Sequence, residues 1–304
     1  MDWQAEIEAA AKRIAGHVVE TPVLRSDAFG RPLELKLEQM QYTGSFKARG
    51  AFATLLASDV PEAGVVAASG GNHGAAVAFA AKALGHRAKI FVPEIAGPAK
   101  IGLIERVGAD LTVVPGEYAN AAALADREAS ESGAMQIHPY DADMTVIGQG
   151  TVMREWEAQA LDADTVLIAV GGGGLIAGAL HWLAGRRKVV GVEPMTACAL
   201  HAALEAGEPV DVPVSGVAAN ALGARRIGEI CFQTSLKAGL DVVRVTDGAI
   251  TEAQKALWQA HRQLVEPAGA AALAALLSGA YTPEPGERVA VLVCGGNIAP
   301  DPDI

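Results

Sequence analysis

The sequence predicts an α/β protein with mostly parallel sheets flanked by helices. Short apolar segments rich in Val, Ile and Leu alternate with longer segments of helical periodicity along most of the chain. These strand-like segments are apolar on both faces, which is typical of strands in a parallel sheet covered by helices on both sides. No repeat of fixed period interrupts the alternation.

The elements follow one another in a simple order. Residues 5–14 form an amphipathic pattern, and the turn residues 43–45 lead into the next helical segment. Strands are expected at residues 33–37, 65–68, 88–92, 111–114, 135–137, 165–170, 189–192, 242–245 and 289–293. Helices are expected at residues 5–14, 46–56, 73–84, 99–107, 119–130, 145–160, from residue 175 onward, at 252–265 and at 268–277.

The domain organisation follows from the strict alternation of strand and helix between residues 58 and 136. We interpret this block as a small domain, residues 58–142, inserted into a large domain made of residues 1–57 and 143–304.

Composition excludes several classes of function. The 304 residues include 51% hydrophobic and 19% charged side chains, which is the composition of a folded protein. With 24 Lys and Arg against 35 Asp and Glu, the net charge of -11 disfavours nucleic acids and anionic membranes as partners. The three cysteines, Cys198, Cys231 and Cys294, lie far apart without metal-binding spacing, so neither zinc nor a disulfide framework is expected.

Targeting and membrane segments are not expected either. The N-terminus lacks the apolar core of a signal peptide. The longest apolar stretch, residues 166–183, contains four consecutive glycines and reads as strand, loop and helix rather than a membrane span. A cytoplasmic protein is the expectation.

The first motif is TGSFKARG at residues 43–50, which places Lys47 in the first turn of a helix. The positive end of the helix dipole and burial would both lower the pKa of its amine. A lysine with an accessible neutral form is what Schiff-base chemistry requires. An ordinary surface lysine is the alternative that this octapeptide leaves open.

Two glycine-rich loops each lie between an expected strand and helix. In SGGNHG, residues 69–74, the helix start offers N–H groups to a carboxylate, and Asn72 can donate to a phenolate oxygen. A plain turn with Asn72 as the helix cap is the alternative. At residues 171–174, four glycines at a helix start form a nest of N–H groups suited to a phosphate.

The second loop has a rival interpretation. Residues 172–177 also fit the dinucleotide pattern G-x-G-x-x-G/A, with Glu193 ending the next strand about 20 residues later. An NAD(P)-dependent oxidoreductase is therefore the alternative from a different class. The last motif, CGGN at residues 294–297, places Cys294 at a strand's carboxyl end, where α/β folds bind ligands. A buried, inert cysteine is the alternative there.

Taken together and in this order, the motifs resemble those of the fold-type-II pyridoxal-phosphate enzymes, in the serine/threonine dehydratase and serine racemase branch. The resemblance runs from Thr21 to Asn297 and includes HPYD at 138–141, GQGT at 148–151 and EPAGA at 266–270. It implies a two-domain fold whose large domain binds pyridoxal 5′-phosphate. The implied activity is conversion of L-threonine, L-serine or both to 2-oxobutanoate or pyruvate and ammonia by β-elimination. Together, these motifs in one order outweigh the dinucleotide pattern.

The resemblance also implies residue roles. Lys47 would be the Schiff-base lysine and would move the α-proton of the substrate. Phe46 would lie beside the cofactor, Asn72 would bond its ring hydroxyl oxygen, and Cys294 would face its ring nitrogen. The phosphate is expected on Gly171, Gly172, Gly173, Gly174 and Leu175. The substrate is expected beside Gly216, with its carboxylate on the loop formed by Ser69, Gly71, Asn72 and His73.

Departures from the family pattern narrow the expectation. Gly70 stands where serine racemases carry a second proton-transferring serine, so racemisation should be weak. Ala199 replaces the Asp that joins Glu193 and Ala197 in the cation site of some relatives, so no bound metal is expected. Ser215-Gly216 replaces the usual Asp-Gly beside the substrate, which leaves the choice among β-hydroxy amino acids open.

Three further expectations follow from the resemblance. A 3-hydroxyaspartate dehydratase and a serine racemase are the alternatives within the cofactor class. A homodimer is expected from the relatives. Because the chain ends soon after residue 297, we expect neither a regulatory domain nor feedback inhibition by isoleucine.

Overall fold

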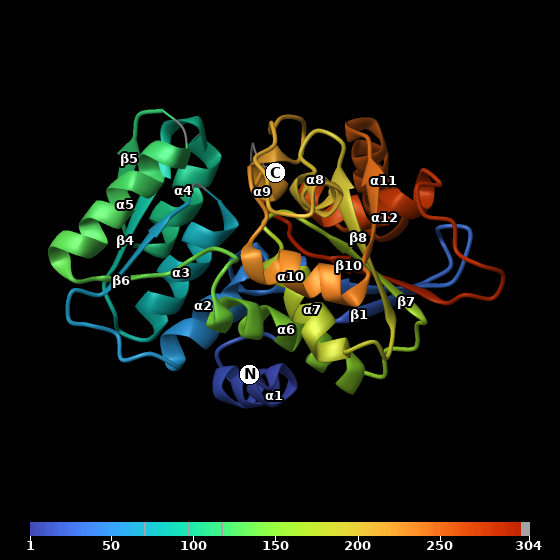
Figure 1. The fold of residues 1–304 in the computed structure, drawn as a ribbon, viewed down its shortest axis with the longest axis horizontal. Coiled ribbons are helices and arrows are strands. Elements are labelled where there is room, and N and C mark those ends of the chain that lie inside the picture. Colours follow the sequence, from blue (N-terminus) through green and yellow to red (C-terminus); the bar gives the residue numbers. More distant parts are fainter. Residues whose placement is uncertain (70, 97, 117, 299–304) are drawn as a thin grey trace.

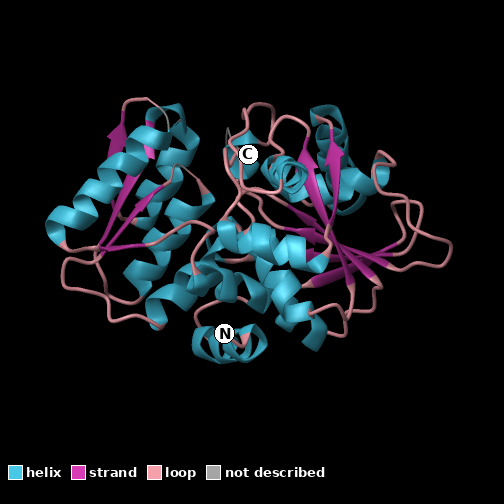
Figure 2. Cartoon of the chain, in the orientation of Figure 1, coloured by secondary structure: helices cyan, strands magenta, loops and turns pink. Residues whose placement is uncertain are grey.

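The computed structural model describes residues 1–69, 71–96, 98–116 and 118–298. Its strands form two separate sheets, as Figure 2 shows. The large sheet has six strands in the order β1-β2-β10-β7-β8-β9, and the small sheet has four in the order β5-β4-β3-β6. Strand β1 pairs antiparallel with β2, and the other ladders are parallel. The predicted α/β fold with mostly parallel sheets is confirmed.

The strands of the large sheet are β1 (Val23–Ser26), β2 (Leu33–Leu37), β7 (Thr165–Ala169), β8 (Lys188–Pro194), β9 (Asp241–Val245) and β10 (Val289–Val293). Those of the small sheet are β3 (Val65–Ala68), β4 (Ala88–Pro93), β5 (Asp110–Val114) and β6 (Met135–Gln136). The small sheet lies wholly within residues 58–142, but the predicted domain boundaries themselves stay a prediction.

The helices up to residue 183 are α1 (Trp3–Ile14), α2 (Lys47–Leu56), α3 (Asn72–Ala83), α4 (Pro98–Val107), α5 (Tyr118–Ser132), α6 (Asp143–Ala158) and α7 (Gly174–Leu183). The later helices are α8 (Ala199–Ala206), α9 (Ala219–Leu222), α10 (Glu229–Ala238), α11 (Asp247–His261) and α12 (Pro267–Leu277). Three short 3₁₀ helices are η1 (Glu38–Met40), η2 (Tyr42–Gly44) and η3 (Glu94–Ala96).

The helices enclose both sheets in layers. Helix α12 contacts β7, β8, β9 and β10, while α7 contacts β7 and β8 from the other side, with α6 and α1 beyond it (Figure 1). In the small sheet, α5 covers β3 and β4, and α3 lies between this sheet and α2 (Figure 1). Strands β7 and β10 are buried along their whole length, as the apolar pattern predicted.

Glycines allow α2, α6 and α7 to pack closely. A Cβ added to Gly148 on α6 would lie 2.6 Å from the Cα of Gly50 on α2, and one added to Gly178 on α7 would lie 2.5 Å from the backbone N of Gly150. Any side chain at these positions would push the helices apart. The GQGT motif therefore serves helix packing, and it brings the start of α2 against the large sheet's helices.

Some elements differ from the prediction. Helix α11 begins at Asp247, because the Thr246 side chain caps it by accepting from Ala249 N at 3.2 Å. It ends at His261 rather than 265, because Arg262 takes a left-handed conformation with φ 56°. Strand β1 and helices α8, α9 and α10 were not predicted, since none has a long apolar run or a strong alternation. In α10, the flanking Gly228 and Gly239 were signals that could have marked its ends.

Candidate active site

The Lys47 amine lies between the start of α2 and the segment that follows β6. Lys47 begins α2, and its Nζ donates a hydrogen bond to the carbonyl O of Pro139, 2.6 Å away, in the segment that follows β6. The same nitrogen lies 5.2 Å from the centre of the Phe46 ring. Burial lowers the pKa of Lys47 to about 8, although the nearby Cys294 opposes this shift. The amine therefore has an accessible neutral form, as the motif predicted.

The loop after β10 is joined directly to the lysine motif. Phe46 N donates to the carbonyl of Cys294 at 3.2 Å, and Gly296 N donates to the carbonyl of Gly44 at 2.9 Å. The Cys294 thiol is buried and donates to the Ala268 carbonyl, 3.3 Å from its Sγ. Burial raises the pKa of Cys294, and the charge of Glu266 raises it further. Cys294 is consequently a neutral thiol at the carboxyl end of its strand.

Asn72 is held from two sides by the large sheet's loops. Its Nδ2 donates to Glu266 Oε1 at 2.5 Å, and its Oδ1 accepts from Asn297 Nδ2 at 2.9 Å. Asn297 Nδ2 also donates to the Thr43 carbonyl at 2.7 Å. The structure thus brings together the lysine motif, the asparagine loop and the cysteine loop, which the sequence places up to 254 residues apart.

The loop around Asn72 is compact. Ser69 Oγ accepts from Gly71 N at 3.2 Å, and the Ser69 carbonyl leaves no room for a side chain at Gly74. The buried His73 ring bonds through Nε2 to the Ile137 carbonyl at 2.9 Å. Burial and the charge of Lys47 lower the pKa of His73 to about 3, so its ring is neutral. Gly70, where racemases carry serine, lies outside the described residues.

The glycine-rich loop ends at the start of α7. Gly173 has φ 95°, a conformation that favours glycine, and no side chain caps the helix among the described residues. Its neighbours leave little room, since a Cβ on Gly172 would lie 2.2 Å from Tyr140 Cδ1 and one on Gly173 would lie 2.4 Å from Cys231 Sγ. Leu175 points its side chain into the core, so only its backbone can face a ligand.

A small hollow of about 180 Å³ adjoins this loop and is lined by His138, Tyr140, Asp141, Pro209, Arg226, Ile227, Gly228 and Glu229. Gly228 N donates to the Gly172 carbonyl at 3.1 Å, and Ile230 N donates to Asp141 Oδ1 at 3.0 Å. Tyr140 was part of the HPYD motif, but its position over the glycines was not predicted.

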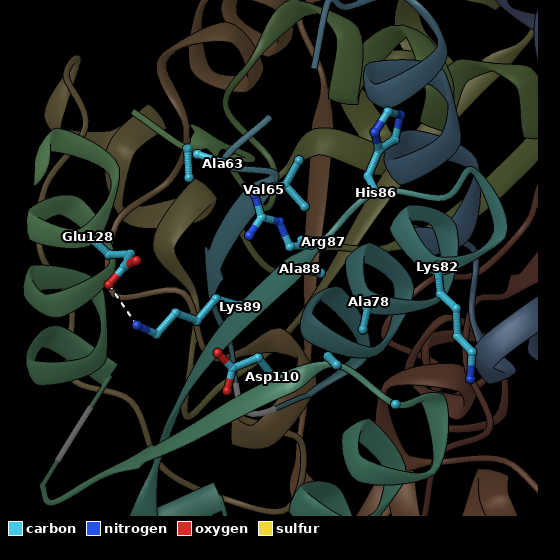
Figure 3. Close-up of a pocket in the computed structure, with 13 residues that line it drawn as sticks. Ala63, Val65, Ala78, Lys82, His86, Arg87, Ala88, Lys89, Asp110 and Glu128 are labelled. Carbon is cyan, nitrogen blue, oxygen red and sulfur yellow. Dashed lines mark hydrogen bonds and ion pairs between the residues drawn. The ribbon is translucent and has the colours of Figure 1, made fainter. Parts of the chain in front are cut away.

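A larger hollow of about 490 Å³ lies elsewhere, along the first residues of the small sheet's strands (Figure 3). Its cations are already engaged. Lys89 pairs with Glu128 at 2.7 Å, as the dashed line in Figure 3 shows, while Lys82 and Arg87 donate to backbone carbonyls. The site around Lys47 lies at the carboxyl ends of the strands, which is where open α/β sheets bind ligands. We therefore assign the site to the Lys47 loops and not to the larger hollow.

Two other predicted positions, Gly216 and Glu193, lie near the carboxyl ends of β8 and β9 in the large sheet. Gly216 has φ 84°, and a Cβ there would lie 2.3 Å from Thr196 Oγ1 and 2.5 Å from Asp247 Oδ2. Asp247 accepts from Thr196 Oγ1 and from Val217 N, each at 3.2 Å, which holds this loop. The buried Glu193 accepts from Leu200 N and His201 N at 2.8 Å each, so both of its oxygens are used.

Arg49 of the lysine motif lies in a buried ionic cluster. It is buried and donates to Glu38 Oε1 and Oε2 at 2.7 and 2.9 Å, and it pairs with Glu155 at 2.8 Å. Lys36 pairs with the same Glu155 at 2.6 Å. These four residues form a closed ionic cluster beside α2.

Comparison with known proteins identifies the family. Residues 14–295 match the family described as pyridoxal-phosphate dependent enzymes. This chain belongs to that family. Pyridoxal phosphate is its cofactor, and the predicted fold-type-II membership in the threonine dehydratase and serine racemase branch is confirmed.

The relatives cover nearly the whole chain. A phenylserine dehydratase from Ralstonia pickettii is 37% identical over 294 residues, which is 94% of this chain and 90% of the relative. A biosynthetic L-threonine dehydratase from Mycobacterium tuberculosis is 39% identical over 313 aligned residues, which is 96% of this chain and 71% of the relative.

Similar solved structures support the same family assignment. Maize serine racemase superposes with a TM-score of 0.92 at 32% identity, covering 98% of this chain and 94% of that one. The T.th. threonine deaminase gives a TM-score of 0.91 at 36% identity, covering 98% of this chain and 99% of that one. The chain is a β-eliminating pyridoxal-phosphate enzyme by this kinship.

The residues present fit pyridoxal phosphate. The start of α7 has no side-chain cap, and the buried hydroxyl oxygens of Thr43 and Ser45 have no hydrogen-bond partner among the described residues, so both can contact a bound cofactor. Glu193, the residue that a dinucleotide would need for its ribose, is buried and has both oxygens engaged. The oxidoreductase alternative therefore lacks its ribose ligand. None of the described helices combines the length and apolar composition that a membrane crossing needs.

Proposed function

We propose that this enzyme is a dehydratase, or ammonia-lyase, for L-threonine, L-serine or both, forming 2-oxobutanoate or pyruvate and ammonia. The observation that carries the proposal is the enclosed Lys47 amine, which has a lowered pKa and lies against the Phe46 ring and the Pro139 carbonyl. The kinship with a threonine dehydratase and a threonine deaminase supports the same reaction.

Lys47 is the group that would attach the cofactor and then act as the base. Bound pyridoxal phosphate supplies an electron sink for bond changes at the substrate's α-carbon. The neutral Lys47 amine removes the α-proton, and loss of the β-hydroxyl then completes the elimination of water. Hydrolysis of the resulting unsaturated amine releases ammonia and the 2-oxo acid. The Pro139 carbonyl would orient Nζ of the free amine, to which it is hydrogen-bonded at 2.6 Å.

The surrounding residues would hold the cofactor. The N–H groups of Gly171, Gly172, Gly173, Gly174 and Leu175 would bind its phosphate at the start of α7. Phe46 would lie beside its ring, Asn72 would donate to its ring oxygen, and Cys294 would face its ring nitrogen. A neutral thiol in that place does not keep the nitrogen protonated, which favours prompt elimination over transamination.

The substrate carboxylate would bind at the start of α3. Ser69, Gly71, Asn72 and His73 form this loop, and the His73 ring is already bonded to Ile137. His73 would therefore contribute its backbone N–H rather than its ring. The β-substituent would lie near Gly216, which Thr196 and Asp247 hold in place.

Phenylserine is a second candidate substrate. The relative from Ralstonia pickettii that matches 94% of this chain is named for that activity. Phenylserine carries the same β-hydroxyl as threonine, with a phenyl group in place of the methyl group. The same Lys47 chemistry would serve both, so only the space beside Gly216 would distinguish them.

The test combines a spectrum with product assays. The purified protein, loaded with pyridoxal phosphate, should show a visible absorbance band that borohydride abolishes, and Lys47→Ala should lack it. L-threonine, L-serine, phenylserine and 3-hydroxyaspartate are then compared by kcat/KM for 2-oxo acid release, with D-serine formation measured in parallel. A band without 2-oxo acid from any of these substrates would overturn the dehydratase proposal. D-serine formed as fast as pyruvate would favour a racemase instead.

We also propose that the enzyme is a cytoplasmic homodimer, as the family resemblance of its motifs implies. Light scattering on the purified holoenzyme measures the mass directly and would contradict the proposal if only a monomer of 31.2 kDa were found.

A further inference from the structure

The hydrogen-bond partners of the Asn72 amide show which of its ends is the oxygen and which is the nitrogen. A carbonyl oxygen can only accept, so the Thr43 carbonyl, 2.7 Å away, identifies the donor end of Asn297. That Nδ2 also points at Asn72 from 2.9 Å, which identifies the facing atom of Asn72 as its oxygen. The other end of Asn72, Nδ2, lies 2.5 Å from the carboxylate of Glu266. All three contacts, those with Thr43, Asn297 and Glu266, are therefore consistent with one orientation of the Asn72 amide.

This arrangement leaves Asn72 one specific capacity. Its Nδ2 carries two hydrogens, and one of them goes to Glu266. Among the described residues no second acceptor contacts Nδ2. Asn72 can therefore present an N–H, and not a carbonyl oxygen, to a ligand beside Lys47. A donor of this kind suits an anionic oxygen such as the phenolate on the cofactor ring.

The surrounding glycines show that the network is tightly enclosed. A Cβ on Gly295 would lie 2.0 Å from Glu266 Oε1, and one on Gly44 would lie 2.4 Å from Asn297 Oδ1. Gly44 also has φ 73°. Glu266 itself is buried, and its backbone N donates to the Gly295 carbonyl at 3.3 Å. A side chain at Gly295 or Gly44 would therefore displace Glu266 or Asn297.

We propose that Glu266 and Asn297 are positioning residues that direct the N–H of Asn72 toward the ring oxygen of pyridoxal phosphate. They act through Asn72 and need not touch the cofactor. The proposal rests on the role of Asn72 given under the proposed function, but it depends on cofactor binding only and not on which amino acid is the substrate.

The test is a double-mutant cycle on cofactor binding. Cofactor-free wild type, Glu266→Gln, Asn72→Ala and the double variant are titrated with pyridoxal phosphate, following the visible band and tryptophan fluorescence. Glutamine keeps an acceptor oxygen for Asn72 but removes the negative charge, so Glu266→Gln should weaken binding about tenfold, as expected when a hydrogen bond to a charged group becomes a neutral one. It should also lower the fraction of the visible-absorbing form across the pH range, because the Asn72 donor to the ring oxygen is held less firmly.

The decisive comparison is between Asn72→Ala and the double variant. If Glu266 acts through Asn72, adding Glu266→Gln to Asn72→Ala weakens binding no further. Additive losses would overturn the proposal and would place the effect of Glu266 elsewhere, such as on the neighbouring Cys294. Glu287→Gln is the matched control, since Glu287 also accepts from side chains, Tyr281 among them at 2.5 Å, but lies at the other end of β10. It should leave the band and the affinity unchanged.

Asn297→Asp tests the second partner. An aspartate cannot donate to Asn72 Oδ1, so Asn72 would turn its oxygen toward Glu266 or lose one contact. Binding should weaken by a similar factor, and the visible fraction should fall. An Asn297→Asp variant with wild-type affinity and spectrum, and an unchanged melting temperature, would contradict the proposal. Because no readout requires turnover, a holoenzyme inactive on every substrate would leave this test intact while removing the dehydratase proposal.

Discussion

The Nζ of Lys47 lies 2.6 Å from the carbonyl oxygen of Pro139, so the first residue of α2 is hydrogen-bonded to the segment that follows β6 of the small sheet. The Pro139 segment is itself fixed from both sides. Ile137 N donates to the Val66 carbonyl at 3.1 Å, and the Ile137 carbonyl is bonded to the His73 ring at 2.9 Å. The position of the amine therefore depends on the small sheet as well as on its own helix.

Replacing Lys47 should stabilise the cofactor-free protein while abolishing turnover. Burial lowers the pKa of Lys47 from 10.5 to about 8, so between those two values the unfolded chain binds more protons than the folded one. The free energy of unfolding therefore rises with pH across this window, and below it the fold carries a penalty for a buried cation. Lys47→Met should raise the free energy of unfolding by about 2 kcal/mol at pH 7.

Urea unfolding at several pH values measures this effect. The gain from Lys47→Met should shrink as the pH approaches 10.5, where both states of the wild type lose the proton. Lys89→Met is the control, because Lys89 is partly exposed and its amine pairs with Glu128. A Lys47→Met protein that is less stable than wild type at pH 7 would contradict the argument.

Gly172→Ala should weaken cofactor binding because of one steric conflict. The new methyl group would lie 2.2 Å from Cδ1 of Tyr140, so either the ring or the loop must move. Overpacking of this kind typically corresponds to an affinity loss of about tenfold. Adding Tyr140→Ala removes the obstacle and should restore part of the affinity, as measured by titration with pyridoxal phosphate.

The control for this pair is Gly102→Ala on α4. A Cβ at Gly102 would meet Arg106 no closer than 3.5 Å, which is an ordinary contact. Equal affinities of Gly172→Ala and Gly102→Ala for the cofactor would contradict this argument. They would show that the loop can accommodate a methyl group beside Tyr140.

Local sequence predicted where the candidate site residues lie in the fold, because the lysine motif, the two glycine-rich loops and the CGGN loop each lie at a strand end or a helix start. Lys47, the glycine loops and Cys294 could be placed at strand and helix ends, and parallel strands bring such ends to one edge of a sheet. The partners of these residues could not be predicted in the same way. Glu266 lies 194 residues from Asn72, and the EPAGA motif alone does not show which loop its carboxylate faces.

Residues in the motifs can also have roles that the motif does not reveal. Arg49 follows Lys47 by two positions, yet its guanidinium is buried between Glu38 and Glu155 and makes no contact with the Lys47 amine among the contacts described. The direction of the Arg49 guanidinium depends on the geometry of α2 and on the position of Glu155, which lies far away in the sequence on α6. Likewise, the direction of the His73 ring depends on where the chain after β6 passes.

Arg49→Met should therefore destabilise the fold strongly. Removing the guanidinium leaves Glu38 and part of Glu155 as buried carboxylates without their main partner, which typically costs about 3–5 kcal/mol. Arg288 is a matched comparison, since it also joins two carboxylates, Asp162 and Asp164, but on the exposed surface. Arg288→Met should change the melting temperature little. Equal effects of the two variants in thermal unfolding would show that the buried cluster is not what stabilises α2.

Activity should not depend on a divalent cation. The cation site of some relatives would need Glu193 to turn its oxygens outward, but here both accept backbone N–H groups at the start of α8, at 2.8 Å each. Burial raises the pKa of Glu193 to about 7, so near neutral pH the carboxyl group is only partly ionised. Ala199 contributes only a methyl group where an aspartate oxygen would be required, and magnesium and calcium need several oxygen ligands.

Dialysis against a chelator should leave kcat and the melting temperature unchanged. Introducing Ala199→Asp should instead make the melting temperature rise with added calcium or magnesium. A wild-type enzyme that lost activity to the chelator and regained it with either ion would show that Glu193 is released from α8 when the ion binds.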